Sequence, residues 1–235
     1  MQIHGLQKMT LLDYPGKVAC TVFLAGCNYA CPFCHNSQLL TPDAEPMMQE
    51  EELLSFLKKR QGVLDGVCIT GGEPMLNPGL RQLLERIKAL GYAIKLDTNG
   101  SRPAVLRQLA QAGLVDYVAM DVKNGPEQYG QTVGVPGLKL ERVEESLRFL
   151  IGGSIPYELR TTLVQQLHDE ASVAAMGRWL AGLVPGKVPE VLYLQSFVDR
   201  ESVAFVGLSA PTPEQKERFA QLLQPFVQKV CLRGG

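Results

Sequence analysis

The hydrophobic positions along the chain fall into two alternating patterns. Short apolar runs, rich in β-branched residues and bounded by turn residues, predict buried strands at 18–24, 66–70, 92–97, 115–121, 157–164 and 191–194. Between them, apolar residues recur three or four positions apart and predict helices at 50–60, 80–87, 103–112, 140–151, 170–183 and 213–228. A last short apolar piece at 229–232 predicts an edge strand.

Two of these helices also carry start signals in the sequence. Asn77 stands before Pro78, and proline is favoured at the first helical position because its missing N–H is not needed there. Thr212 precedes the last helix, with Gln215 at the position that completes a capping box.

About six strand–helix units follow one another, and such alternation is typical of a parallel sheet with helices packed outside it. Six units are fewer than the eight of a complete barrel, so we expect an open, partial parallel β/α barrel that forms a single domain over 1–235. A flat, doubly wound sheet is the alternative. In either architecture the functional residues are expected at the carboxyl ends of the strands.

Composition and charge exclude several classes of protein. The chain has 23 basic and 24 acidic residues and no basic run, which argues against nucleic acid or an anionic membrane as a partner. The longest apolar stretch, 18–25, is too short to span a membrane, and the first ten residues lack the pattern of a secretory signal. We therefore expect a cytoplasmic protein.

The strongest chemical signal is a group of three cysteines within eight residues. Cys27, Cys31 and Cys34 form the spacing C-x3-C-x2-C directly after the first predicted strand. In a reducing compartment, clustered cysteines are typical metal ligands. They supply three ligands, whereas a 4Fe–4S cluster takes four, so one iron would stay open for another ligand. A zinc site would need a fourth ligand, and His35 is adjacent to Cys34; loose structural cysteines are the other alternative.

This motif resembles that of the radical S-adenosylmethionine superfamily. Leu12-Asp13-Tyr14-Pro15-Gly16 before the loop and Cys34-His35-Asn36 at its end further resemble the activating proteins of glycyl radical enzymes, especially those of anaerobic ribonucleoside-triphosphate reductase. The resemblance extends along nearly the whole chain.

The resemblance implies an anaerobic iron–sulfur oxidoreductase that cleaves S-adenosylmethionine reductively to a 5′-deoxyadenosyl radical. This radical then abstracts hydrogen from a glycine of a partner glycyl radical enzyme, with flavodoxin or ferredoxin as the electron donor. No catalytic side chain beyond the cluster and the cofactor is expected. The alternatives are activation of pyruvate formate-lyase or another glycyl radical enzyme, a radical enzyme acting on a small molecule, and a metal-binding module without catalysis.

Thr70-Gly71-Gly72-Glu73-Pro74 ends the second predicted strand. Two glycines let the backbone approach a ligand closely, and the Glu73 carboxylate suits an ammonium group. The alternative is an ordinary strand-to-helix turn. The resemblance implies that Gly72 and Glu73 hold the amino group of the methionine moiety, and Gly71 is a further candidate for cofactor binding.

The third and fourth predicted strands end in acids, at Asp97-Thr98 and at Asp121-Val122-Lys123. Burying these carboxylates is costly without a cationic partner. A salt bridge from Lys123 to one of them is one interpretation. The resemblance implies that Asp97, Thr98, Asp121 and Lys123 line the cofactor site, near a bound monovalent cation.

The remaining candidates lie on later strands and in loops. Arg160 would bond either the cofactor carboxylate or Glu158, and Gln195 would contact the ribose or the adenine. The resemblance adds Phe33 and His35 as cofactor neighbours beside the cluster.

For other positions we expect less specific roles. Cys20 and Cys68 are expected in the core, and His168 on the surface or in a loop. Asp13 and Tyr14 are candidates to guard the mouth of the site. The glycine-rich stretch 124–139 could be a lid, a partner contact or a passive connection.

Overall fold

The computed structural model describes residues 1–233, and these group into two compact units. The first contains Met1–Asn28, Gln38–Thr98 and Ala104–Ala119; the second contains Tyr29–Ser37, Asn99–Pro103 and the chain from Met120 onward. The single domain expected from the sequence stays a prediction.

Four strands build the sheet of the first unit, in the order β6-β5-β3-β2. Their bounds are β2 Gly5–Thr10, β3 Ala19–Leu24, β5 Gly66–Gly71 and β6 Ala93–Thr98. β3, β5 and β6 are parallel, whereas β2 pairs antiparallel with β3. Two short strands, β1 (Gln2–Ile3) and β4 (Met48–Gln49), pair antiparallel with each other.

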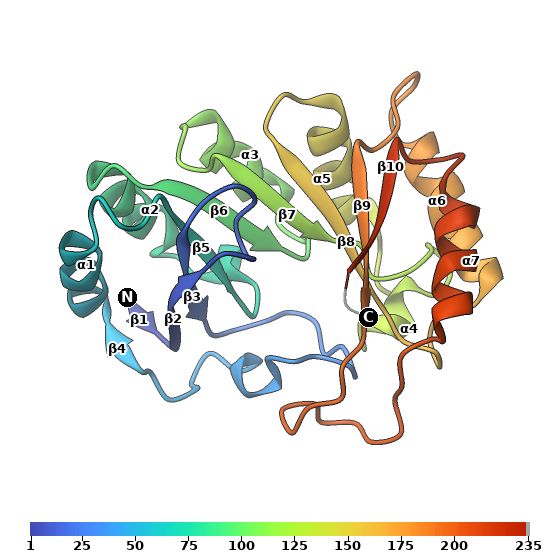
Figure 1. The fold of residues 1–235 in the computed structure, drawn as a ribbon, viewed down its shortest axis with the longest axis horizontal. Helices are drawn as coiled ribbons and strands as arrows, with labels where there is room; N and C mark the ends of the chain where they lie inside the picture. The colour runs from blue at the N-terminus through green and yellow to red at the C-terminus, as the bar shows by residue number, and fades with distance from the viewer. Residues whose placement is uncertain (234–235) are drawn as a thin grey trace. The chain divides into compact units, whose positions relative to one another are not determined.

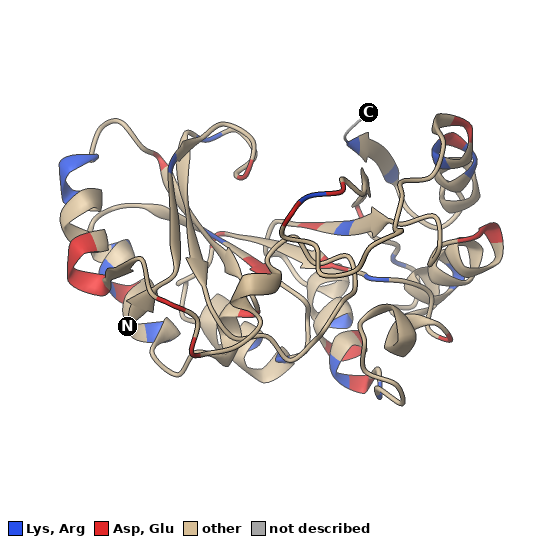
Figure 2. Cartoon of the chain, turned by 90° about the horizontal axis from the view of Figure 1, so that it is seen from below, with Lys and Arg blue, Asp and Glu red and all other residues tan. Residues whose placement is uncertain are grey.

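The helices after these strands are α1 (Glu50–Lys59), α2 (Leu80–Ala89) and α3 (Pro103–Gln111). In α1, Gln49 and Glu52 form a capping box. Glutamates occupy the first turn of α1 and lysines the last, which suits the helix dipole and is visible in Figure 2. The buried positions Leu53, Leu54 and Leu57 share the inner face of this helix.

The second unit continues the same strand–helix alternation. Its strands β8 (Tyr157–Leu163), β9 (Val191–Ser196) and β10 (Lys229–Arg233) are parallel, in the order β10-β9-β8. Its helices are α4 (Tyr129–Thr132), α5 (Glu141–Gly152), α6 (Glu170–Gly182) and α7 (Pro213–Leu223). Helices α6 and α7 pack side by side, and α7 also packs against β10 (Figure 1). Strand β7 (Tyr117–Asp121) carries the chain from the first unit into the second.

The fold class expected from the sequence is confirmed, because the chain is an α/β protein whose sheet is mostly parallel. The last helix ends earlier than expected, at Leu223 instead of residue 228. Gln224 still has helical backbone dihedrals, but Pro225 follows it and has no N–H with which to continue the helical hydrogen bonds. Strand β2 was not predicted because its sequence, GLQKMT, has no apolar run and lies at the sheet edge.

Tyr14 lies at the amino ends of the strands and not at the mouth of the site, so its expected position was wrong. Its ring is 3% exposed and packs in one cluster with Ala19, Cys68, Ala93 and Tyr117. Three of these residues begin strands β3, β6 and β7. The aromatic ring is buried there because this end of the sheet offers an apolar surface.

The neighbouring Asp13 is also tied to the inside of the first unit, since its Oδ2 accepts a hydrogen bond from Thr21 Oγ1 at 2.6 Å. The core positions expected for Cys20 and Cys68 are confirmed, because both side chains are fully buried. Burial raises the pKa of each thiol to about 12, so neither is a reactive thiolate at neutral pH.

We predict that Tyr14→Ala lowers the free energy of unfolding by about 3–5 kcal/mol, since deleting a buried aromatic ring leaves a cavity. Urea denaturation measures this change. Tyr14→Phe is the matched control, because it keeps the ring and is expected to cost less than about 1.5 kcal/mol. A Tyr14→Ala chain that unfolds at the wild-type urea concentration would contradict the packing role.

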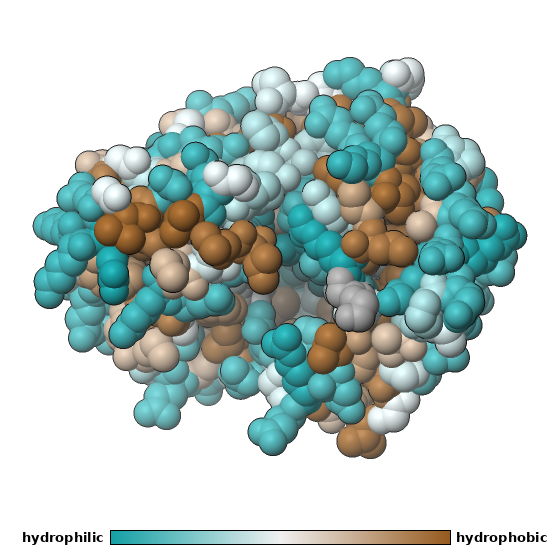
Figure 3. Space-filling model, viewed as in Figure 1, coloured by the Kyte–Doolittle hydropathy of each residue, from teal (hydrophilic) through white to brown (hydrophobic). Residues whose placement is uncertain are grey.

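Exposed apolar side chains gather on β2 and the turn after it, as Figure 3 shows. Met9, Leu11 and Leu12 are 60%, 69% and 87% exposed. Within residues 1–233, no helix combines the length and the apolar character that crossing a bilayer requires.

Candidate active site

The cysteine loop begins directly after β3, in the first unit. Two backbone hydrogen bonds close its base, from Gly26 N to Leu39 O at 2.8 Å and from Cys27 N to Leu40 O at 2.9 Å. The Cys27 side chain is partly exposed. The end of the first parallel strand therefore leads straight into the first candidate ligand, as the sequence predicted.

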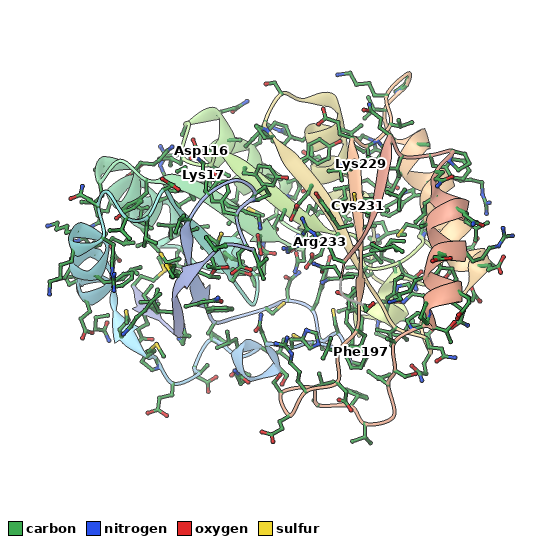
Figure 4. All side chains as sticks on the ribbon, viewed as in Figure 1. Lys17, Asp116, Phe197, Lys229, Cys231 and Arg233 are labelled. Carbon is green, nitrogen blue, oxygen red and sulfur yellow. The ribbon has the colours of Figure 1, made fainter. Side chains whose placement is uncertain are left out.

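Cys31 and Cys34 belong to the second unit and lie in a tight turn, where Cys34 N donates to Cys31 O at 3.1 Å. Phe33 between them is buried in a cluster with Val164, Phe197 and Val203. The His35 ring stacks on Phe197 (labelled in Figure 4), with ring centroids 5.7 Å apart, and its Nε2 lies 2.7 Å from Val198 O. Phe33 and His35 thus have packing roles in this unit, and their expected cofactor contacts stay predictions.

The donor set fits an iron–sulfur cluster by its chemistry. None of the three cysteines forms a disulfide within the described residues, and their side chains are partly exposed. Thiolates are the ligands that such clusters take, one per iron. Across residues 1–233, no three His, Cys, Asp or Glu side chains are grouped closely enough to hold one metal ion. The cluster assignment therefore rests on residue type and spacing.

Gly71 and Gly72 pack against the backbone that leads into the cysteine loop. Gly72 N donates to Leu24 O at 2.9 Å, and Glu73 N donates to Gly26 O at 2.7 Å. A Cβ added to Gly71 would lie 2.2 Å from Leu24 O, and one added to Gly72 would lie 2.3 Å from Gly26 O. Gly71 also has a φ of +121°, which side chains rarely adopt. Both glycines are therefore needed for local packing, in addition to any approach to a ligand.

Glu73 and Thr98, both predicted site residues, contact each other in the first unit. The Glu73 side chain is fully buried. Its carboxylate accepts hydrogen bonds from Thr98 Oγ1 at 3.0 and 2.9 Å and from Met75 N at 3.1 Å. These donors fix the carboxylate at the carboxyl ends of β5 and β6, and its expected contact with an ammonium group stays a prediction.

Lys95 is a charged residue that our sequence interpretation missed. It lies within β6, is 1% exposed, and its Nζ contacts Asp97 Oδ1 at 2.5 Å. Residues two apart in a strand point to the same face, so Lys95 and Asp97 are neighbours by strand geometry. The available signal was a lysine inside an apolar strand, two positions before a predicted site acid.

In the second unit, Asp121 bonds two cations at once. Lys123 Nζ contacts Asp121 Oδ2 at 2.9 Å, and Arg160 Nε contacts Asp121 Oδ1 at 2.9 Å. Burial acts to raise the pKa of Asp121, but the charges of Arg160 and Lys123 lower it more, to about 2. Burial likewise acts to lower the pKa of Lys123, but Asp121 outweighs it and raises the pKa above the ordinary value. All three groups are therefore charged at neutral pH.

These contacts resolve two interpretations that the sequence left open. The salt bridge proposed for Lys123 is formed, and its partner is Asp121. Arg160 also bonds Asp121, whereas Glu158 accepts from Arg233 Nη2 at 3.1 Å (Arg233 is labelled on β10 in Figure 4). The expectation that Glu158 is the protein partner of Arg160 is not supported by these contacts.

We predict that Asp121→Asn lowers the free energy of unfolding at pH 7 by about 3 kcal/mol, because two largely buried cations, each 15% exposed, lose their counter-charge. The folded pKa of about 2 lies below the ordinary 3.8, so the wild-type contribution is present above pH 3.8 and is lost as the pH falls through about 2. Urea denaturation at pH 7 and at low pH should show the two chains converging in acid. Glu85→Gln, in an exposed pair with Arg81, is the control and should have no resolvable effect.

The glycine-rich stretch 124–139 is anchored beside the cysteine loop, within the second unit. Ala30 N donates to Val133 O at 2.9 Å. Asn124 Nδ2 donates to Thr132 Oγ1 at 2.9 Å and to Leu167 O at 2.7 Å. Tyr129, in α4, is fully buried. These contacts support the neighbouring loop, and neither a lid nor a partner contact is tested by them.

His168 lies in the loop between β8 and α6, which is one of the two expected places, but its side chain is buried. Its ring is 4% exposed, with Nε2 2.9 Å from Lys123 O and Nδ1 accepting from Val164 N at 3.1 Å. It thereby fixes the backbone that carries Lys123. Gln195 lies near the carboxyl end of β9, in register with Thr162 and Arg233, and its expected cofactor contact stays a prediction.

Comparison with known proteins agrees with these features. Residues 21–171 match the family described as the Radical SAM superfamily, in which SAM is S-adenosylmethionine. A Methanocaldococcus jannaschii protein named "Putative glycyl-radical enzyme activating enzyme MJ1227" is 26% identical over 239 residues, covering 98% of this chain and 95% of that protein.

Two further relatives match over about half of their own length. The pyruvate formate-lyase-activating enzyme of Clostridium pasteurianum is 30% identical over 128 residues, 52% of each chain. The 7-carboxy-7-deazaguanine synthase of Hyperthermus butylicus is 37% identical over 128 residues, 54% of this chain and 50% of that protein.

A domain of the pyruvate-formate lyase-activating enzyme from Bacteroides vulgatus has the same fold, with a TM-score of 0.58 at 23% identity, over 72% of this chain and 99% of that one. The family match covers more than half of this chain and includes all three clustered cysteines and the Gly71-Gly72-Glu73 motif. The chain is an enzyme that belongs to the radical S-adenosylmethionine superfamily, and within it is similar to glycyl-radical-enzyme activating enzymes.

Proposed function

We propose that this enzyme activates a glycyl radical enzyme, and that its partner is an anaerobic ribonucleoside-triphosphate reductase. The observation that carries the activase assignment is the full-length similarity to the Methanocaldococcus jannaschii protein, joined to the packing of the Gly71-Gly72-Glu73 motif on the cysteine loop. The choice of reductase rests on the sequence around the cysteines, from Leu12-Asp13-Tyr14-Pro15-Gly16 to Cys34-His35-Asn36.

In this proposal, Cys27, Cys31 and Cys34 hold a 4Fe–4S cluster whose remaining iron binds S-adenosylmethionine. Held by these cysteines, a reduced cluster would supply the one electron needed to cleave the carbon–sulfur bond of S-adenosylmethionine to methionine and a 5′-deoxyadenosyl radical. Hydrogen transfer from a glycine Cα then leaves 5′-deoxyadenosine and a glycyl radical on the partner. The residues proposed to bind the cofactor are Phe33, His35, Gly71, Gly72, Glu73, Asp97, Thr98, Asp121, Lys123, Arg160 and Gln195.

The side chains of this enzyme bind and orient, and none needs to give or take a proton. The Glu73 carboxylate, fixed by Thr98 Oγ1, is placed to accept hydrogen bonds from the methionine ammonium group. Asp121 keeps Lys123 charged and positions both Lys123 and Arg160, so that these cations can attract the methionine carboxylate. Excluding water from the site would protect the radical from side reactions.

The same resemblance suggests a monovalent cation, but the acids present do not fit one. Asp97 already contacts the Lys95 ammonium, and Asp121 contacts both Lys123 and Arg160. We therefore include no monovalent metal cation, such as potassium or sodium, in the proposed site.

Partner, electron donor and location are further parts of the proposal. We propose flavodoxin or ferredoxin as the electron donor, an anaerobic setting, and the cytoplasm as the compartment. Within residues 1–233 none of the six cysteines is in a disulfide, which suits a reducing compartment.

A second candidate function is catalysis on a small molecule. The 37% identity to a 7-carboxy-7-deazaguanine synthase favours it, although that match covers about half of each chain. Activation of pyruvate formate-lyase is a third, favoured by the 30% identity to its activating enzyme.

One experiment separates these functions. The cluster is reconstituted and reduced without oxygen, S-adenosylmethionine and the candidate reductase are added, and the electron paramagnetic resonance spectrum is recorded. A glycyl doublet on the reductase together with 5′-deoxyadenosine is the expected result. Deoxyadenosine without the doublet would reject this partner and direct the search to pyruvate formate-lyase and small molecules. Stoichiometric zinc without sulfide would reject radical chemistry.

A further inference from the structure

A buried lysine lies at the place where a metal cation would otherwise be expected. Lys95 is 1% exposed, the Asp97 side chain is 15% exposed, and their charged atoms are 2.5 Å apart. An ammonium group removed from water needs a counter-charge, because an unpaired buried charge is strongly destabilising. Asp97 supplies that counter-charge, and in return its own negative charge is compensated from within the chain.

Strand geometry fixes this pair. Lys95 and Asp97 lie two residues apart in β6 and so share one face of the sheet. Lys95 is also in register with Cys68 of β5, which is fully buried and gives the lysine stem an apolar neighbour. The ammonium is therefore held beside Asp97 by the fold before any ligand arrives.

A free potassium or sodium ion would compete at a disadvantage for this carboxylate. It would lose translational freedom on binding and shed water, whereas the tethered ammonium has already met these costs during folding. It would also have to displace a group of the same charge. The second acid expected at a cation site, Asp121, is bonded by Lys123 and Arg160.

We infer that the Lys95 ammonium is the built-in counter-ion of Asp97, so that S-adenosylmethionine binding requires no monovalent metal cation. The part that concerns S-adenosylmethionine rests on the proposed function, and the counter-ion role does not. Lys95 is a positioning residue in this scheme, because it acts on the cofactor through Asp97.

The first test uses the wild-type chain in about 0.1 M potassium, sodium or tetramethylammonium chloride, three salts of equal ionic strength. Equilibrium dialysis of the reconstituted, oxidised enzyme measures the Kd for S-adenosylmethionine, and a thermal scan measures the Tm of the cluster-free chain. We expect both values to be the same in all three salts, with Kd within about twofold. A Kd about tenfold weaker in tetramethylammonium would overturn the inference.

The second test removes the ammonium group with Lys95→Met, which keeps the length of the side chain. Its Kd should be at least about tenfold weaker in tetramethylammonium and recover in potassium, because Asp97 now needs an external cation. The Tm of the cluster-free Lys95→Met chain should likewise be higher in potassium chloride than in tetramethylammonium chloride. Lys58→Met, at an exposed position of α1, is the matched control and should respond to neither salt.

The double variant Lys95→Met/Asp97→Asn should lose the potassium response, because the charge that attracts the cation is gone. A folded Lys95→Met chain with wild-type Kd and Tm in every salt would overturn the counter-ion role. If Lys95→Met does not fold, the wild-type comparison alone decides. A wild-type chain that binds no S-adenosylmethionine in any salt would reject the proposed function, while its Tm in the three salts would still test the pair.

Discussion

Cys31→Ala is expected to abolish stable assembly of the cluster and all cleavage of S-adenosylmethionine. The motif offers three thiolates, and a 4Fe–4S cluster with one open iron needs every one of them. Cys31 also lies at the start of the hydrogen-bonded turn to Cys34, so its loss removes the first of the two ligands in that turn. Iron and sulfide analysis after anaerobic reconstitution, followed by chromatographic measurement of 5′-deoxyadenosine, tests this expectation.

Cys20→Ala and Cys68→Ala are the matched controls, because they remove thiols that are fully buried in strands. Each is expected to lower the free energy of unfolding by about 1 kcal/mol and to leave the iron content unchanged. Cleavage by Cys31→Ala at the wild-type rate would refute the ligand assignment. Loss of iron in either control would show that the cluster is held elsewhere.

The sequence was informative wherever an element is defined by its own residues. β-Branched runs located the parallel strands, and the Thr212–Gln215 capping box located the start of α7. It was uninformative where an element depends on a distant partner. β2 is an edge strand with exposed residues, and it exists because β3 offers it hydrogen bonds.

The site residues show the same division. Glu73 and Thr98 were chosen separately, each at the end of a strand, and parallel pairing of β5 and β6 brings them into contact. Tyr14 was assigned to the wrong end because a loop residue carries no periodicity that shows which end of the sheet it covers. Strand alternation offered Glu158 as one of two candidate partners of Arg160, the cofactor carboxylate being the other, whereas Asp121, which Arg160 bonds, comes from another strand.

Lys95 was missed for a physical reason. A lysine between apolar residues breaks the strand pattern, and the usual interpretation is an exposed position. Here the ammonium is buried because Asp97, two residues later, pairs with it. An apolar strand interrupted by a lysine and then an acid at the next position of the same face is thus a signal for an internal ion pair.

The packing of the cofactor motif on the cysteine loop links stability to function. Glu73 N donates to Gly26 O, one residue before Cys27, so the backbone of the proposed methionine-binding motif supports the base of the loop that carries the ligands. A substitution that displaces the backbone of one segment should therefore displace the other segment as well.

Gly72→Ala tests this link and is expected to have the second large effect. The new Cβ would lie 2.3 Å from Gly26 O and 3.1 Å from Leu39 O. Both are backbone atoms of the segments that close the cysteine loop, so no side-chain rearrangement can relieve the overlap. We expect the free energy of unfolding to fall by about 4 kcal/mol or more, and the iron content after reconstitution to fall with it. Urea denaturation of the cluster-free chain and iron analysis measure the two effects separately.

Gly182→Ala is the matched control, because it is the same substitution at a glycine with open space around it. No heavy atom lies within 4 Å of a Cβ added at this last residue of α6. Alanine there should stabilise the chain by roughly 0.5–1 kcal/mol, since glycine has the larger entropy to lose in a helix. If Gly72→Ala folded with wild-type stability and full iron content, the contact between Gly72 and Gly26 would not be a structural constraint. Normal stability with lost iron would instead show that the glycine serves the ligand loop alone, because the fold would then tolerate a displacement that the cysteines do not.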